Sequence, residues 1–338
     1  MVQSVKWRSL GIGGSARHRN ECTVILTVTP NAAVDKTFRI EGFSLNRVHR
    51  PSLTHTVAGG KGINVARVYQ TLGGQAVCTG FLGGAQGSIV ARALAAENLP
   101  NHFVPCQGET RLCIAVIDPT TGTQTEINEL GPEITMRAVS ELLRRVQSLL
   151  SQQDFDFVVL CGSLPPGAPD NLYAELIRLA NERGVRTVLD SSGAALREGV
   201  AAKPWMVKPN RVELESLIGE PPGDLSACRT HAEALRKQGI EVVAVTLGEQ
   251  GALLVTEQGC VKATPPSVEF ASAVASGDSF LAAFLWAWTH GPSPADAEYA
   301  LSLACAAGAA NAAVIGAGFC SRESILTGLT QVSARACL

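Results

Sequence analysis

Short apolar strands that alternate with amphipathic helices most strongly restrict the fold of this 338-residue chain. β-branched runs such as DFVVLCG and EVVAVTLG have the length and composition of strands buried on both faces. Helical periodicity predicts helices at 135–151, 170–183, 211–218 and 226–238. Strands joined by helices form βα units with right-handed crossovers. The sequence therefore predicts an α/β fold, a three-layer αβα sandwich around a mostly parallel central sheet.

The same domain is expected to extend towards both ends of the chain. It begins with the strand TVILTVT, and a helix follows the turn AGGKG. The runs RTVLDSS and WMVKPN are predicted as two successive strands without a helix between them. Later segments predict a hairpin of GALLVTE and GCVKATPP, and helices at 279–290, 294–314 and 321–329. Because no linker divides the chain, we expect one domain over residues 23–338.

Two pairs of strands are predicted to lie outside the sandwich, at about 35–57 and 111–128. In the first pair, Gly42 and polar residues separate Asp35–Glu41 from Asn46–Val57. In the second pair, a turn joins RLCIAVID to QTEINEL. Their alternation of polar and apolar residues predicts strands with one face left open. We therefore expect a small β-strand appendage on the domain.

Composition excludes several classes of function. A net charge of -2 without a basic run argues against binding to nucleic acid or to an anionic membrane surface. No uninterrupted apolar stretch reaches the roughly 18 residues that a membrane-spanning helix needs. Residues 1–22 are basic and lack the apolar core of a signal peptide, so we expect a disordered extension, with a transit peptide as the alternative.

The ten cysteines are scattered and never form a C-x-x-C pair. Several lie inside apolar runs such as VVLCGS and LACAAG, where a cysteine behaves as a small hydrophobic residue. This usage predicts a reducing, cytoplasmic environment and no cysteine metal cluster.

Unusual loops follow most of the predicted strands. In open α/β sheets, ligands bind beyond the carboxyl ends of the strands, so these loops predict one composite site. One loop has Lys61 among Gly59, Gly60 and Gly62 at a helix start, where a glycine-rich turn with a lysine favours an anion. Its spacing differs from that of a Walker loop.

The stretch Glu269–Trp288 predicts a loop of small residues feeding a buried helix. Unpaired N–H groups and a partial positive charge at such a helix start favour an anion. Ser276, Gly277 and Asp278 also have a composition that caps helices, so a capped core helix is the alternative.

Asn210 and Glu213 stand three residues apart at another helix start. They suit a cap with a first-turn acid, or a carboxylate oriented towards hydrated Mg²⁺. Asp35 suits either a turn cap or a ligand contact, and Arg111 suits either a substrate phosphate or the edge of a sheet. A serine or cysteine nucleophile is disfavoured, because no histidine lies in a neighbouring loop after a strand.

Eleven segments together resemble the PfkB family of ribokinase-like carbohydrate kinases, within the branch of 1-phosphofructokinase and tagatose-6-phosphate kinase. They span residues 24 to about 318 in order: TVTPNAAVDKTF, AGGKGINVARV, GFLGG, ETRLCIAV, TEINELGPEI, GSLPPG, VLDSSGAAL, VKPNRVEL, VTLGEQGALL, ASGDSFLAAFL and AAGAANA. The resemblance implies a ribokinase-like fold in which the two outlying strand pairs form a lid.

The resemblance also implies roles for individual residues. The base would be Asp278, and the anion hole would be formed by Ala275, Ser276 and Gly277. The sugar phosphate would contact Asp35, Gly59, Gly60, Lys61, Asn64 and Arg111. ATP would contact Lys208, Thr246, Gly248, Gly251 and Asn311, with Asn210 and Glu213 organising Mg²⁺ through water. Ala275 departs from the glycine usual at the first position of the family's G-A-G-D.

The implied activity is the MgATP-dependent phosphorylation of a ketohexose monophosphate. Fructose 1-phosphate is the first expectation; tagatose 6-phosphate is the alternative, and fructose 6-phosphate a lesser one. A non-catalytic sugar-phosphate sensor is the alternative from another class. In this family lids often pair between subunits, so we also expect a homodimer formed through the lid.

Overall fold

The computed structural model describes residues 23–221, 223–293 and 295–337, so the predicted extension at 1–22 lies outside the described residues. Within these residues ten strands form one sheet: β1 (Val24–Thr29), β4 (Gln75–Leu82), β5 (Val104–Pro105), β8 (Phe157–Cys161), β9 (Arg186–Asp190), β10 (Met206–Val207), β11 (Val242–Thr246), β12 (Ala252–Thr256), β13 (Gly259–Thr264) and β14 (Ser333–Ala336). Their order is β14-β13-β12-β11-β10-β9-β8-β1-β4-β5. The strands from β11 to β5 run parallel, and β12, β13 and β14 are antiparallel.

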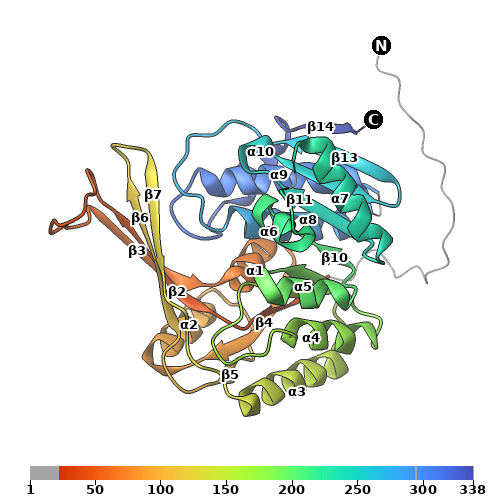
Figure 1. Cartoon of the computed structure of the whole chain (residues 1–338). Coiled ribbons are helices and arrows are strands. Elements are labelled where there is room, and N and C mark those ends of the chain that lie inside the picture. The colour runs from red at the N-terminus through yellow and green to blue at the C-terminus, as the bar shows by residue number, and fades with distance from the viewer. Residues whose placement is uncertain (1–22, 222, 294, 338) are drawn as a thin grey trace.

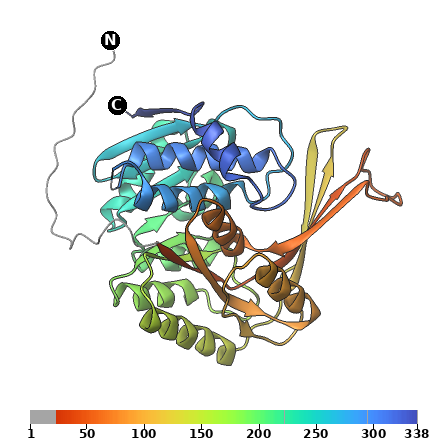
Figure 2. The ribbon, with the colours of Figure 1, turned by 180° about the vertical axis from the view of Figure 1, so that it is seen from behind.

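Helices cover both faces of this sheet (Figures 1 and 2). One face carries α1 (Lys61–Thr71), α2 (Gly84–Ala96), α8 (Ser276–His290), α9 (Ala297–Ala312) and α10 (Arg322–Leu329). The other carries α3 (Met136–Gln152), α4 (Leu172–Asn181), α5 (Gly193–Ala201), α6 (Arg211–Ile218) and α7 (Leu225–Lys237). A separate apolar core fills each interface between sheet and helices, and the predicted three-layer sandwich is confirmed.

A second sheet, here called the lid sheet, projects from the sandwich (Figure 1). It contains β2 (Ala33–Arg39), β3 (Leu53–Gly59), β6 (Arg111–Asp118) and β7 (Thr123–Asn128), in the order β3-β2-β6-β7. The prediction that the second strand starts at Asn46 is wrong, because pairing begins only after Pro51, where the Ser52 amide donates to the Arg39 carbonyl at 2.9 Å. Pro51 has no N–H to offer a ladder.

Helix α5 was not predicted from the sequence, although the topology requires it. Strands β9 and β10 are adjacent and parallel, and parallel neighbours need a crossover connection. α5 provides that crossover between them. The closing strand β14 and the 3₁₀ turn Gly248–Gln250 were also not predicted, and α8 begins three residues before the expected position 279.

No helix among the described residues is long and apolar enough to cross a membrane. The nine described cysteines are all present as thiols, and six of them are buried together with apolar side chains of the two cores.

Candidate active site

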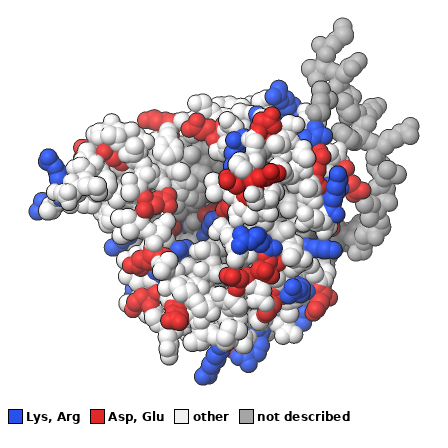
Figure 3. Space-filling model, in the orientation of Figure 1, with Lys and Arg blue, Asp and Glu red and all other residues white. Residues whose placement is uncertain are grey.

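A cavity of about 1160 Å³ lies between the lid sheet and the carboxyl ends of the parallel strands, visible as the hollow in Figure 3. Lysines, arginines, aspartates and glutamates are interspersed on this face of the molecule. Every site residue expected from the sequence lines the cavity except Gly59 and Asn311. The fold therefore gathers segments that are far apart in the chain.

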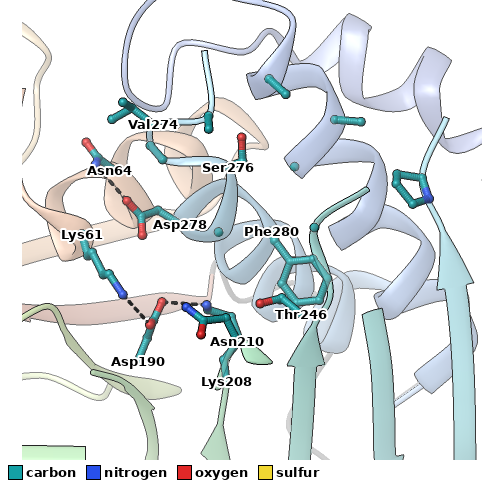
Figure 4. A pocket seen from close by; sticks show the side chains of 18 of the residues that line it. Lys61, Asn64, Asp190, Lys208, Asn210, Thr246, Val274, Ser276, Asp278 and Phe280 are labelled. Atoms are coloured by element: carbon teal, nitrogen blue, oxygen red, sulfur yellow. Dashed lines mark hydrogen bonds and ion pairs between the residues drawn. The ribbon is translucent and has the colours of Figure 1, made fainter. Parts of the chain in front are cut away.

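The start of α8 forms one wall of this cavity (Figure 4). Ala275 takes the N-cap position in the left-handed region, with φ 64° and ψ 10°, and no side chain caps the helix. The alternative interpretation, in which Ser276, Gly277 or Asp278 caps this helix with its side chain, is therefore wrong. The amide groups at its N-terminus have no capping side chain and border the cavity, where the helix dipole favours an anion.

Asp278 lies in the first turn of α8 and is 5% exposed. Its Oδ2 accepts a hydrogen bond from Asn64 Nδ2 at 2.9 Å. Burial raises the pKa of Asp278 to about 6, against the opposing effect of the nearby Lys61 ammonium. A buried carboxyl with such a pKa can take a proton from a hydroxyl near neutral pH.

Asp190 connects two lysines at the floor of the cavity, as Figure 4 shows. Its Oδ1 lies 2.8 Å from Lys61 Nζ, and its Oδ2 lies 3.0 Å from Lys208 Nζ. Burial acts to raise the pKa of Asp190, but the two ammonium groups outweigh it and keep the pKa low. A Cβ on Gly277 would lie 3.5 Å from Lys208 Nζ, so one of these cations lies beside the amides of α8.

The glycine turn before α1 is shaped by its neighbours. Gly59 lies against the Asp35 carboxyl group, which occupies the place of a Cβ, and Gly60 has φ 107°. Burial raises the pKa of Asp35 to about 6, although Arg111 acts to lower it. Arg111 donates to the Glu129 carbonyl at 3.4 Å, and its buried Nε has no hydrogen-bond partner among the described residues. The Arg111 guanidinium beside Asp35 can therefore still donate a hydrogen bond to a ligand.

Asn210 and Glu213 cap the start of α6, as one of the two interpretations predicted, and the cap leaves Glu213 Oε1 unused. They form a capping box, in which Asn210 Oδ1 accepts from the Glu213 amide at 2.9 Å and Glu213 Oε2 accepts from the Asn210 amide at 2.8 Å. Glu213 Oε1 lies on the cavity side, 3.8 Å from Lys61 Nζ. The described residues contain no cluster of three carboxylate, histidine or cysteine ligands. This arrangement suits a hydrated Mg²⁺ held through its waters.

The far end of the cavity is less polar. Thr246 ends β11, and the turn from Gly248 to Gly251 follows it. Beyond them the wall is largely apolar, with Pro265, Pro266, Val268, Phe270, Cys305, Ala309 and Ala312. A flat heterocycle can lie against such a surface.

The comparison with protein families decides the assignment. The model of the pfkB family of carbohydrate kinases matches residues 28–324, nearly all of the described chain. The chain belongs to the pfkB family of carbohydrate kinases. The expected phosphotransferase class and the ribokinase-like fold are thereby confirmed.

Curated relatives of this pfkB kinase include both tagatose-6-phosphate kinases and 1-phosphofructokinases. The tagatose-6-phosphate kinase of Staphylococcus epidermidis is 37% identical over 77% of this chain and 83% of its own length. The 1-phosphofructokinase of Rhodobacter capsulatus is 38% identical over 79% of this chain and 84% of its own length. Among solved structures, phosphofructokinase-2 from Escherichia coli in complex with substrates and products has a TM-score of 0.84 at 30% identity, covering 91% of this chain and 98% of that one.

The sequence did not predict where Asp190 and Asn311 of this pfkB kinase lie. Asp190 was not singled out, although a carboxylate at the end of the buried strand RTVLD was a usable signal. Asn311 is fully buried behind the anion-hole turn. It donates to the Val274 carbonyl at 2.7 Å and accepts from the Gly318 amide at 2.9 Å. Asn311 thus holds the segment before α8.

Proposed function

We propose that this pfkB kinase transfers the γ-phosphoryl group of ATP to a primary hydroxyl of a ketohexose monophosphate, converting fructose 1-phosphate to fructose 1,6-bisphosphate. The observation that carries the proposal is Asp278, a buried carboxyl with a pKa of about 6 at the uncapped start of α8. The proton acceptor Asp278 and the anion-binding start of α8 therefore border the same part of the cavity. Relatives named 1-phosphofructokinase in three organisms support the choice of substrate.

The proposed mechanism begins with Asp278 and the acceptor hydroxyl. As the hydroxyl oxygen attacks the γ-phosphorus, its proton passes to Asp278, and the bond from phosphorus to the β,γ-bridging oxygen breaks to release ADP. Asn64 holds the carboxylate in place by its hydrogen bond at 2.9 Å. Asp35 binds sugar hydroxyl groups across the cavity.

Charge on the transferring phosphoryl group is stabilised by groups that are already in position. The Gly277 amide lies at the uncapped start of α8, with Lys208 Nζ beside it, and the Ser276 amide, which donates to the Ala273 carbonyl at 3.2 Å, would turn to the phosphoryl group when it binds. Such preorganised donors act most strongly on charge that develops in the transition state. Glu213 and Asn210 would hold Mg²⁺ through its waters, and the bound ion would neutralise charge on the ATP phosphates.

The phosphate already present on the sugar is assigned to Arg111 and Lys61. Arg111 and Lys61 both border the cavity. The buried Nε of Arg111 has no hydrogen-bond partner within the described part of the chain, and the Lys61 side chain is partly exposed. A guanidinium binds a phosphate with paired hydrogen bonds. Tagatose 6-phosphate is the second candidate, favoured by the 37% identity to a tagatose-6-phosphate kinase. Fructose 6-phosphate is a lesser candidate.

One coupled assay of ADP release tests the substrate. The purified chain is given MgATP with fructose 1-phosphate, tagatose 6-phosphate, fructose 6-phosphate or unphosphorylated fructose. We expect the highest kcat/KM with fructose 1-phosphate and a loss of at least tenfold without a sugar phosphate. A fastest rate with unphosphorylated fructose would contradict the substrate class. Sugar-phosphate binding without ADP release would favour the sensor alternative.

Assembly and compartment complete the proposal. We assign a homodimer formed through the lid sheet, supported by exposed apolar side chains on it and on its loop: Leu45 at 84%, Val48 at 85% and Ile127 at 58% exposure. An inhibited phosphofructokinase-2 from Escherichia coli with a similar structure is described as tetrameric. We assign the cytoplasm on the reduced cysteines.

A further inference from the structure

Arg67 lies one turn beyond Asn64 on helix α1, behind the residues that border the cavity. Its side chain is 7% exposed and does not line the cavity. A buried guanidinium must find partners for five N–H donors. The partners of Arg67 are therefore informative about its role.

All five donors of Arg67 are used. Nε and Nη2 donate to the Glu97 carboxylate at 2.7 and 3.1 Å. The second N–H of Nη2 donates to the Ala58 carbonyl at 2.8 Å, and Nη1 donates to the Ala317 carbonyl at 2.8 Å. The remaining N–H of Nη1 donates to Asn64 Oδ1 at 3.0 Å. The guanidinium plane is thus fixed on every side.

This last contact determines how the Asn64 amide is oriented. The arginine side chain only donates hydrogen bonds, so the oxygen of the Asn64 amide must face Arg67. The NH₂ group must then face the opposite way, where Asp278 Oδ2 lies 2.9 Å from it. A flipped amide would present its oxygen to the carboxylate and its NH₂ to a cation, and both contacts would be repulsive.

We propose that Arg67 is a positioning residue for phosphoryl transfer, because it fixes the Asn64 amide in the orientation that donates to Asp278. The inference rests on the proposed function in taking Asp278 as the base. Arg67 contacts neither ATP nor the sugar phosphate. It would act on the base Asp278 through the Asn64 amide.

The hydrogen bond from Asn64 influences the pKa of Asp278 because no other group in the described structure donates to this carboxylate. The charged groups facing it are Lys61 from α1, Lys208 after β10, Asp190 at the end of β9 and Asp35 from β2. None of these donates a hydrogen bond to it in the described structure, whereas Asn64 does. The Asn64 hydrogen bond acts to lower the pKa of Asp278 against the effect of burial. Losing it would raise that pKa.

Two Arg67 variants test the proposal. Arg67→Lys keeps the charge but has three donors and no planar fork, so it does not hold Asn64. The double variant Arg67→Met with Glu97→Met replaces the whole ion pair by apolar groups, a change that folded proteins often tolerate. Glu97→Gln is the matched control, because it weakens the ion pair and leaves the contact from Arg67 to Asn64.

The pH dependence of kcat/KM for the sugar phosphate is the decisive activity readout, since it reports ionisations that purely structural damage does not move. We expect the acid limb to shift upward by about one pH unit in both Arg67 variants, with a loss of about fivefold at pH 6. Titration of the substrate phosphate is common to all variants and cancels. Glu97→Gln should lower the thermal midpoint and keep the wild-type limb. A folded Arg67 variant with the wild-type limb and rate would overturn the proposal.

A second readout needs no turnover. The side-chain amide resonance of Asn64, assigned by its loss in Asn64→Ser, should titrate in the wild type with a midpoint near the pKa of about 6 of Asp278. In a folded Arg67 variant we expect this midpoint to rise or the titration to vanish. An unchanged titration would refute the role of Arg67. Absence of turnover with every sugar phosphate would instead refute the proposed function. The titration of the Asn64 resonance would still show whether Arg67 orients the Asn64 amide.

Discussion

At the scale of single residues, the candidate site concentrates ionisable groups that the fold buries at a cost. Asp278 is 5% exposed and Asp190 is fully buried, yet one has a raised pKa and the other a lowered one. The difference follows from their partners. Asp190 contacts two lysines within 3.0 Å, whereas Asp278 accepts from the neutral amide of Asn64. One carboxylate is therefore a fixed counter-ion and the other a group able to accept a proton.

The raised pKa of Asp278 predicts a dependence of stability on pH. The folded-state pKa is about 6 against an ordinary value of 3.8, so between these values the folded protein holds more protons than the unfolded one. The free energy of unfolding should fall as pH rises through this window, by roughly 3 kcal/mol from this group, and then level off. Asp278→Asn should therefore unfold at higher urea concentration than wild type at pH 8. Equal or lower stability of the variant at pH 8 would contradict this assignment of the pKa.

Asp190 gives a second prediction at the same scale. Asp190→Asn leaves Lys61 and Lys208 without their shared counter-ion, and breaking a buried ion pair in this way typically costs about 3–5 kcal/mol. We expect that loss in urea unfolding, together with a fall of more than tenfold in kcat. Glu141→Gln is the control, since its contacts with Arg144 and Arg145 lie on the surface and contribute about 1 kcal/mol or less. Similar losses in the two variants would argue against the role of Asp190.

Much of the site could be predicted from residues, and the misses have physical causes. Glycines around Lys61 and a carboxylate three residues after Asn210 are local patterns with few explanations, and both segments line the cavity. The link from Asp190 to two lysines depends on strands being adjacent, which no local pattern encodes. The same holds for Asn311, whose neighbours at 274 and 318 are set by the packing of α9.

At the scale of elements, the start of α8 is the decisive piece of backbone. Its N-cap residue Ala275 adopts φ 64°, a region that costs a residue with a Cβ about 1–2 kcal/mol. Strain of this kind persists where the surroundings determine the backbone, and Asn311 holds the carbonyl of Val274 just before it. From sequence, Ala275 was a departure from glycine; in the structure it takes the left-handed conformation that glycine would take.

A β-branched residue at this position should be poorly tolerated. Ala275→Val should lower stability by roughly 1–3 kcal/mol and reduce kcat at least tenfold, because the turn can relax only by moving the amides of α8. Ala295→Val is the matched control, since Ala295 also has a left-handed φ, 55°, and does not line the cavity. Its stability should fall by a similar amount while kcat of the remaining folded protein is kept. Equal effects of the two variants on kcat would contradict a special role for the turn.

At the scale of the whole molecule, the lid sheet has two different faces. Side chains alternate along a strand, and Asp35, Arg111 and Cys113 face the cavity. Their neighbours Lys36 and Ile114 therefore lie on the outer face, together with Ile127, the register partner of Ile114. On the inner side the lid already contacts the body, because Gln124 Oε1 accepts from Ser272 Oγ at 3.1 Å and from the Ala273 amide at 3.2 Å. Alternation in the sequence predicted the strand appendage, and the family resemblance implied its role as a lid, but neither predicted this contact.

The proposed homodimer gives the prediction at this scale. Ile127 is 58% exposed on the outer face of the lid sheet, so Ile127→Glu should bury a charge in a dimer formed there. We expect sedimentation to show a dimer for wild type and a monomer for this variant, with little change in monomer stability. Leu326→Glu on α10, where Leu326 is 39% exposed, is the control and should stay dimeric. A variant at Ile127 that remains dimeric would place the interface elsewhere.

The central claim is that Asp278 is the base of an ATP-dependent sugar-phosphate kinase, and one variant tests it most directly. In Asp278→Asn the new amide oxygen can still accept from Asn64, so the fold and the binding of fructose 1-phosphate should be preserved. Without a proton acceptor, ADP release in the presence of fructose 1-phosphate should fall by about 10²–10⁴-fold. Sugar-phosphate affinity measured by calorimetry should stay within about threefold of wild type. An Asp278→Asn enzyme that turns over at the wild-type rate would contradict the account.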